Sequence, residues 1–197
     1  EKYESDVAMS LNNIAALHAG TNRLSEAERE YGEALAIRRR LAEMNPETFE
    51  PDMAETLNGL ACLHADMDRH VDAERGYDEA LAIRRRLAEA NAEKFGLELA
   101  KVLNNLATSH AAMSRSAEAE REYAEAVSIC RRMVSICPEK SESYLAGVLN
   151  NAANLHFDTG SLAEAEREYG ESFKVYRHLA EMCPEKFEPV LAVVQAN

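Results

Sequence analysis

Four histidines stand at a constant spacing along the chain and are the first residues that could do chemistry. Each lies seven residues after a leucine, in the stretches LNNIAALHAG, LNGLACLHAD, LNNLATSHAA and LNNAANLHFD, and they are His18, His64, His110 and His156. Imidazole nitrogens bind zinc and act as general bases. Zinc requires its ligand nitrogens to converge within about 2.1 Å of one point, whereas equivalent residues of stacked helices lie roughly 8–10 Å apart. We therefore expect no metal site and no cofactor, and each imidazole should pack in the core and hydrogen-bond a neighbour.

Asparagines recur beside these histidines, and asparagine is a mediocre residue for the middle of a helix. One interpretation is that the amides hydrogen-bond between adjacent repeats or to their own turn. The other is that they align along one face, where an amide donates and accepts hydrogen bonds and so can hold the backbone of an extended peptide. The sequence leaves both open for Asn12, Asn13, Asn58, Asn104, Asn105, Asn150, Asn151 and Asn154.

Three arginine runs, Arg38–Arg40, Arg84–Arg86 and Arg131–Arg132, raise the alternative of a phosphate-binding patch. They fall at the ends of predicted helices, where cations compensate the helix dipole and long side chains cover apolar surface. The chain also carries 22 basic against 35 acidic residues, a formal charge of −13. Such a field repels phosphate backbones and anionic lipid surfaces, so we expect neither nucleic acid nor a membrane as partner.

The sequence shows no sign of an enzyme. It contains no Gly-rich phosphate loop, no paired carboxylates in a buried setting and no Ser/His/Asp set. Its four cysteines form no C-x-x-C motif, which favours free thiols in a reducing compartment and a cytoplasmic location. The first residues, EKYESD, lack a methionine, and we expect the chain to be part of a longer protein.

The histidine spacing reflects a repeat of the whole sequence every 46 residues. The stretch SEAEREYGEALAIRRRLAEMNPETF of the first repeat returns as VDAERGYDEALAIRRRLAEANAEKF in the second. Each repeat predicts two helices, which in the second repeat run from about 50 to 66, with Pro51 near the first turn, and from about 71 to 90. The repeats cover about 1–46, 47–92, 93–138 and 139–184, and 185–197 begin a partial fifth.

Neither helix of a repeat can bury its apolar stripe alone, but stacked hairpins can. Alanines recur at one position of each helix, and their small size lets backbones approach closely. Tyrosines at 31, 77, 123 and 169 fill the larger gaps. We therefore predict an all-α fold, a right-handed α-solenoid that forms a single domain over residues 1–197.

The pattern resembles the tetratricopeptide repeat (TPR) family in a lengthened form, most similar to the kinesin light chain type. In the first repeat the motif positions are Leu11, Ile14, Ala15, His18, Ala27, Tyr31 and Ala34. Three departures are visible: histidine replaces the tyrosine of the first helix in every repeat, Ala152 replaces a large apolar residue, and Ser172 replaces the last alanine.

The resemblance implies a concave groove lined by the first helices of the repeats. Lys101 is its only basic residue, with Glu55 and Asp158 of opposite charge, so a clamp for a C-terminal carboxylate is disfavoured. Carried over by motif position, the groove contains Met9, Asn12, Asn13, Ala16, Glu55, Asn58, Cys62, Lys101, Asn104, Asn105, Thr108, Asn150, Asn151, Asn154, Phe157 and Asp158.

The sequence thus predicts a non-enzymatic protein–protein interaction scaffold that binds a peptide segment of a partner. The alternative is a structural array, or a spacer within a larger signalling protein, that self-associates through its terminal repeats. The partial fifth repeat supports the alternative, because Val190, Leu191, Val193 and Val194 predict an apolar helix face that needs a cover.

Overall fold

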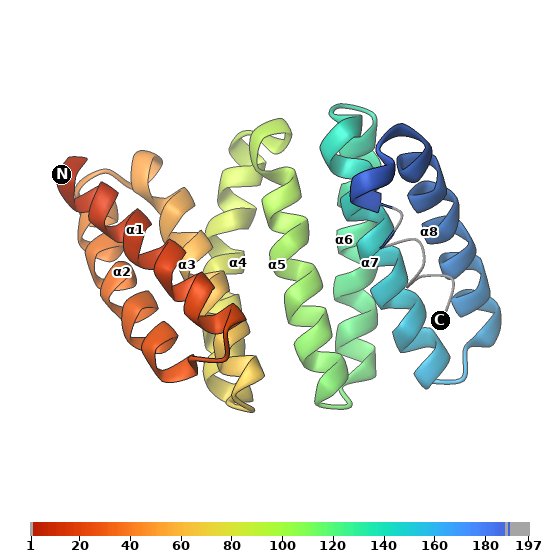
Figure 1. Cartoon of the computed structure of the whole chain (residues 1–197), viewed down its shortest axis with the longest axis horizontal. Helices are drawn as coiled ribbons and strands as arrows, with labels where there is room; N and C mark the ends of the chain where they lie inside the picture. Colours follow the sequence, from red (N-terminus) through yellow and green to blue (C-terminus); the bar gives the residue numbers. More distant parts are fainter. Residues whose placement is uncertain (1, 188, 190–197) are drawn as a thin grey trace. The chain divides into compact units, whose positions relative to one another are not determined.

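The computed structural model describes residues 2–187 and 189, apart from the side chain of Glu139, and across them the chain is α-helical apart from the short turns between helices (Figure 1). The Ala, Glu, Leu and Arg content of the repeats favours helix intrinsically. No strand occurs in this part of the chain. The helices are α1 (Lys2–Gly20), α2 (Leu24–Met44), α3 (Pro46–Asp66), α4 (His70–Ala90), α5 (Ala92–Ala112), α6 (Ser116–Val134), α7 (Pro138–Asp158) and α8 (Leu162–Met182).

The chain divides into two compact units, Glu1–Ala90 and Asn91–Asn197. Each contains two helical hairpins that stack as in an α-solenoid, α1–α4 in the first unit and α5–α8 in the second. Beyond α8, residues 184–187 are helical, and Phe187 is buried against Tyr176 and Leu179. The predicted apolar residues Val190, Leu191, Val193 and Val194 lie outside the described residues.

Helix α3 begins earlier than the sequence predicts, because an asparagine caps it. Asn45 caps α3 by accepting a hydrogen bond from the backbone N–H of Thr48 at 3.2 Å, and Pro46 occupies the first helical position. Asn91 caps α5 in the same way through Lys94, at 3.0 Å. The prediction that α3 starts near residue 50 was therefore wrong, and Pro51 lies inside the helix rather than in its first turn. The asparagine cap fixes the start, because it satisfies a backbone donor that the helix itself leaves unpaired.

A left-handed residue joins the two helices of every hairpin. Asn22, Asp68, Ser114 and Gly160 have φ of 59°, 57°, 59° and 81°. The next residue along the chain donates its backbone N–H to the carbonyl of the hairpin's histidine, at 2.8 Å in the first, second and fourth hairpins and 2.9 Å in the third. This is the hydrogen-bond pattern that ends a helix with a left-handed residue. The histidine carbonyl therefore accepts the bond that reverses the chain.

Replacing Ser114 by glycine should stabilise the protein, because a serine side chain disfavours positive φ and glycine does not. We expect a gain of about 0.5–1 kcal/mol in the free energy of unfolding, measured by urea denaturation. The control is Ser128→Gly at an exposed position within α6, where glycine should destabilise the helix by a few tenths of a kcal/mol, roughly. A loss of stability in Ser114→Gly would contradict the assignment of the turn.

Fully buried alanines form the contact between the two helices of each hairpin. Ala15 and Ala27 have no exposed surface, and the equivalent pairs in the other hairpins are at most 2% exposed. A second set joins Ala8, Ala34 and their equivalents, all with no exposed surface. In the last hairpin this set contains Ser172, whose hydroxyl donates to the backbone oxygen of Ala146 at 2.8 Å. Small side chains thus bring the two helix backbones close together.

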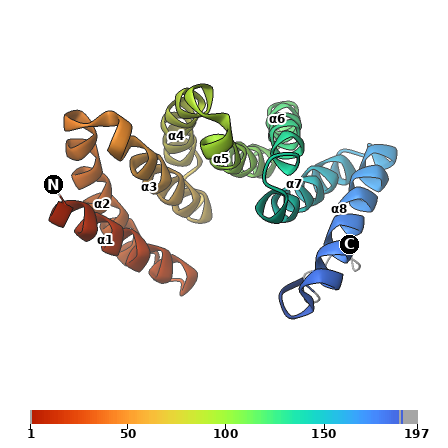
Figure 2. The same ribbon diagram turned by 90° about the horizontal axis from the view of Figure 1, so that it is seen from above.

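Neighbouring hairpins of a unit meet differently on their two sides. The first helices touch directly, α1 against α3 and α5 against α7 (Figure 2). One ion pair connects the two second helices of each unit. Arg39 pairs with Glu79 at 2.6 Å in the first unit, and Arg131 pairs with Glu171 at 2.7 Å in the second. Each unit therefore has a first-helix face, formed by α1 and α3 or by α5 and α7, where the helices lie closer together.

Candidate functional site

The four histidines are structural groups, and three of them share one partner type. In the first, third and fourth hairpins Nδ1 lies 2.7, 2.8 and 2.6 Å from a glutamate twelve residues later, in the pairs His18–Glu30, His110–Glu122 and His156–Glu168. Each pair joins the first helix of a hairpin to the second. The expectation that the imidazoles pack and hydrogen-bond a neighbour is met by this geometry. The sequence reasoning did not name the glutamates, although their shared repeat position was visible.

The second hairpin has Gly76 where the others have glutamate. The His64 ring instead lies with Nε2 at 3.2 Å from Glu28, on the preceding α2. Glu28 also pairs with Arg69, and this hydrogen bond is the main reason that the pKa of Glu28 falls below its ordinary value. His156 makes a related contact, since its Nε2 lies 3.9 Å from Glu120 on the preceding α6.

Replacing His110 by leucine should destabilise the second unit by about 1.5 kcal/mol at neutral pH, because Glu122 loses a hydrogen bond made to its charged form. Burial raises the pKa of Glu122 above its ordinary value of 4.5, and the His110 hydrogen bond opposes that shift. A raised folded-state pKa contributes stability below 4.5 that is lost as pH rises through the folded value. Without His110 the pKa of Glu122 rises further. The loss of unfolding free energy in His110→Leu, relative to the parent protein, should therefore be largest at neutral pH and small below pH 4.5.

Urea denaturation at pH values from below 4.5 to neutral measures this dependence. Glu122→Gln is the control, because its amide keeps a hydrogen bond to His110 but does not titrate. A deficit of equal size at both ends of the range would contradict the proposed role of the carboxylate.

In the first unit, Asn12 connects the two hairpins. Its Oδ1 accepts hydrogen bonds from the hydroxyl of Thr56 at 3.0 Å and from Arg38 Nη1 at 3.4 Å. Arg38 is only 4% exposed and also donates to the backbone oxygen of Asp52 at 2.6 Å. Arg38 is thus a buried structural residue and not part of an anion-binding patch. The arginines that follow it are likewise held in ion pairs, Arg40 with Glu4 and, in the equivalent place, Arg86 with Glu50.

The other predicted groove residues of the first unit divide by exposure. Met9 is 51% exposed, and Asn13 and Glu55 are exposed as well. Asn58 is 8% exposed and therefore lies in the interior. In the first unit Asn12 therefore hydrogen-bonds between adjacent repeats, as one of the two interpretations predicts, whereas the amide of Asn13 is at the surface.

In the second unit, two asparagines meet between the first helices. Asn151 Nδ2 on α7 donates to Asn104 Oδ1 on α5 at 3.0 Å, and Asn104 Nδ2 lies 3.4 Å from Asn105 Oδ1. Both Asn104 and Asn151 are half-buried. They border a shallow cavity of about 250 Å³ whose other walls are Ser143, Tyr144, Gly147 and Val148.

Tyr144 is a site residue that the sequence reasoning missed. Its hydroxyl lies near Lys101, and burial raises its pKa. The repeat positions equivalent to 144 are Asp6, Asp52 and Glu98. The change from an acid to an aromatic residue in the last repeat was the signal that could have identified it.

Four other predicted residues of the second unit lie on the same two helices, Lys101 on α5 and Asn150, Asn154 and Phe157 on α7. Lys101 is half-buried and lies 3.9 Å from Glu98, so its charge is already paired. Asn150 is half-buried, and its Oδ1 is enclosed without a hydrogen-bond partner in the described structure. Asn154 accepts a hydrogen bond from Tyr169, and Phe157 is 59% exposed.

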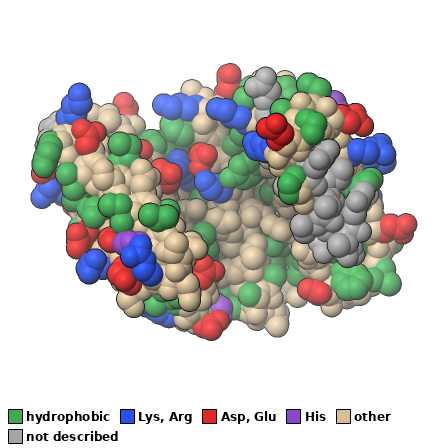
Figure 3. Space-filling model, viewed as in Figure 1, with side chains coloured by type: hydrophobic (Ala, Val, Ile, Leu, Met, Phe, Trp, Pro, Cys, Tyr) green, Lys and Arg blue, Asp and Glu red, His purple; other side chains and the backbone are tan. Residues whose placement is uncertain are grey.

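Other kinds of site have no counterpart in the described residues. No group of three or more His, Cys, Asp or Glu side chains there is placed to hold a metal ion. No described helix is long and apolar enough to cross a membrane. Acidic and basic side chains are interspersed on the surface seen in Figure 3.

Comparison with known proteins identifies the repeat. The tetratricopeptide repeat family matches at residues 7–45, 53–91, 99–136 and 145–181. The crystal structure of BtubC (BKLC) from P. vanneervenii is similar in fold, with a TM-score of 0.70 and 20% sequence identity. That match covers 87% of this chain, which spans 64% of the BtubC chain. No curated protein matches at a significant level. The four repeats show that the chain belongs to the tetratricopeptide repeat family.

Proposed function

We propose that this chain is a protein–protein interaction scaffold that binds an extended peptide segment on its first-helix face, with Asn104 and Asn151 at the centre. The scaffold role follows from the repeat family. The observation that carries the finer proposal is the Asn104–Asn151 pair, which lies at the rim of a cavity between α5 and α7.

The hydrogen-bonding capacity of this pair matches a peptide backbone. Asn151 uses one N–H toward Asn104, and its Oδ1 has no hydrogen-bond partner among the described residues. It therefore retains an acceptor and a second donor, the two groups that a backbone amide requires. Ser143 adds a hydroxyl and Tyr144 an aromatic wall, so the cavity offers polar and apolar contacts to one residue of a peptide.

The charges nearby favour a segment from within a chain over a free C-terminus. Lys101 is paired with Glu98 and also interacts with the Tyr144 hydroxyl. A carboxylate would have to compete with these contacts and with a formal protein charge of −13. Binding through backbone amides carries no such cost.

Selection from a library of displayed peptides, followed by fluorescence anisotropy with the enriched peptides, tests the proposal. Asn151→Ala should weaken binding by about tenfold, the loss of roughly one hydrogen bond at a partly buried site. Lys174→Ala, on the exposed surface of α8, is the control and should bind as the parent does. Unchanged affinity in Asn151→Ala with a folded protein would contradict the proposed site.

A second candidate function is self-association, and the surface of α1 favours it. Leu17 is 61% exposed and Ile14 is 42% exposed, whereas Leu63 and Leu155, the equivalents of Leu17, are 1% and 6% exposed. In the second and fourth hairpins, a second helix of the preceding hairpin packs against the first helix. A second copy of the chain carries helices of that same type, so it can supply the cover for α1.

Sedimentation velocity over a range of concentrations tests self-association. Leu17→Glu should reduce the mass at high concentration, because a charge would be buried in the contact. Phe157→Glu, at another exposed apolar position, is the control and should leave the mass unchanged. A monomer at all concentrations would rule out this function for the chain.

We also propose a cytoplasmic location, which the thiols support. No disulfide joins Cys62, Cys130, Cys137 or Cys183. Burial raises the pKa of Cys130 to about 11, so this thiol is protonated and unreactive at neutral pH.

A further inference from the structure

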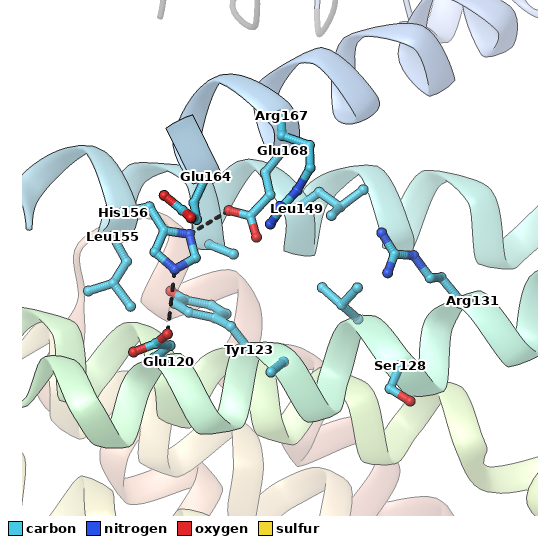
Figure 4. Close-up of a pocket in the computed structure, with 13 residues that line it drawn as sticks. Glu120, Tyr123, Ser128, Arg131, Leu149, Leu155, His156, Glu164, Arg167 and Glu168 are labelled. Atoms are coloured by element: carbon cyan, nitrogen blue, oxygen red, sulfur yellow. Dashed lines mark hydrogen bonds and ion pairs between the residues drawn. The ribbon is translucent and has the colours of Figure 1, made fainter. Parts of the chain in front are cut away.

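A larger cavity lies on the other side of α7, between α6, α7 and α8. Its volume is about 480 Å³, and its apolar walls include Tyr123, Val127, Leu149, Ala152 and Leu155 (Figure 4). The cavity belongs to the second-helix side of the unit, because α6 and α8 form its two flanks. It is separate from the Asn104–Asn151 cavity, which is lined by α5 and α7.

Two small residues account for this cavity. Ala152 stands where the earlier repeats have Ile14, Leu60 and Leu106. Val127, across from it on α6, stands where the first two repeats have Leu35 and Leu81. In the first unit Leu35 is buried and Leu60 is half-buried and packed against the apolar core, so leucine side chains occupy the matching positions. The cavity therefore occupies the space that larger apolar side chains fill at the equivalent positions of the first unit.

The rim of the cavity carries polar side chains that have no internal partner. Glu164, Arg167 and Ser128 line it, and no side-chain hydrogen bond or ion pair of theirs occurs in the described part of the chain. The neighbouring polar groups are occupied, since His156 binds Glu168 and Arg131 binds Glu171. The rim thus offers the charges of Glu164 and Arg167 and the hydroxyl of Ser128, beside Glu120, which lies 3.9 Å from His156.

We propose that this cavity binds an aromatic side chain of a partner protein's peptide segment. The apolar walls bury the ring, and 480 Å³ lies within the range of cavities that hold small ligands. The Arg167 guanidinium can donate to the peptide carbonyl, and Glu164 can accept from the peptide N–H. A pair of opposite charges at the rim matches a neutral amide better than a free hydrocarbon or an ion.

The probe for the test is N-acetyl-phenylalaninamide, followed by shifts of methyl signals in NMR spectra of the whole chain. Signals of Leu149, Leu155 and Val127 should move. Ala152→Leu should fill the cavity and weaken binding about tenfold or more, the value of burying an apolar side chain of this size. Val127→Leu is a second filling variant for the case in which Ala152→Leu does not fold.

The first unit supplies the matched gain-of-binding variant. Leu35→Val together with Leu60→Ala reproduces the residues of the cavity, and the signal of Leu63 should then respond to the probe. Arg167→Ala should weaken binding of N-acetyl-phenylalaninamide while leaving binding of toluene unchanged. Equal affinity for toluene and the amide in the parent protein would overturn the peptide assignment, and unchanged binding in a folded filling variant would overturn the site.

Because the two cavities lie on different sides of α7, the outcomes of the two proposals are separable. Asn151→Ala should leave binding of N-acetyl-phenylalaninamide unchanged, and Ala152→Leu should leave binding of the selected backbone-bound peptides unchanged. A loss of both activities in a variant that remains folded would overturn the assignment of two separate sites.

Discussion

Tyr77→Ala should lower the free energy of unfolding of the first unit by about 3–5 kcal/mol, the cost of removing a large buried aromatic ring. Tyr77 is 2% exposed and is the largest fully buried side chain in the described structure. Its hydroxyl donates to Cys62 at 3.3 Å, and burial raises its pKa. The ring connects α4 to α3, so its loss leaves a cavity at the centre of a hairpin.

Urea denaturation, with hydrogen exchange to locate the loss, measures this effect. Tyr169→Ala is the matched control, because Tyr169 occupies the same repeat position on α8 but is only half-buried. Its cost should be clearly smaller. Equal costs at the two positions would show that burial does not decide the role of these tyrosines.

Ala80→Leu should destabilise the same helix by about 1–3 kcal/mol, through overpacking instead of a cavity. Ala80 has no exposed surface, and neither has Ala54, its counterpart in the buried alanine set. A leucine would push α4 away from α3. Thermal and urea denaturation both measure the effect, and unchanged melting would show that this face of α4 is not packed.

Ala80→Ser is the control for this prediction, and the chain itself suggests it. Ser172 holds the equivalent place in the fourth hairpin, and its hydroxyl bonds the Ala146 backbone oxygen at 2.8 Å. This buried alanine contact between the two helices therefore tolerates one additional hydroxyl when that hydroxyl can donate to a backbone oxygen. Ala80→Ser should stay within about 1 kcal/mol of the parent protein.

The fold could be predicted because one pattern repeats four times. A single alanine or tyrosine has many explanations, but the same residue at the same place in four repeats indicates a contact that each hairpin makes. This reasoning identified the helices, the buried alanines and the structural role of the histidines. It erred at the start of α3, because it treated Pro51 as the start signal and overlooked the cap of Asn45 and the proline that follows it.

The candidate site could be predicted only in part, because side-chain direction depends on fine details of packing. Asn12, Asn58 and Asn104 share one repeat position. Asn12 bonds Thr56 and Asn104 bonds Asn151, while Asn58 is buried. Their neighbours differ from repeat to repeat, for example Thr56 against Val148, so the same amide meets different partners. The sequence showed Ala152 as a departure from the motif but did not predict the cavity beside it, which Val127 on the facing helix also lines.

The ion pair between Arg131 and Glu171 has a mechanical consequence for the second unit. It spans α6 and α8, which flank the cavity beside Ala152, and both of its side chains are partly exposed. Dissolved ions screen such a pair, and the first helices below it are held by direct contact instead. Added salt should therefore weaken this contact between α6 and α8 by up to about 1 kcal/mol, while the packing of both helices against α7 persists.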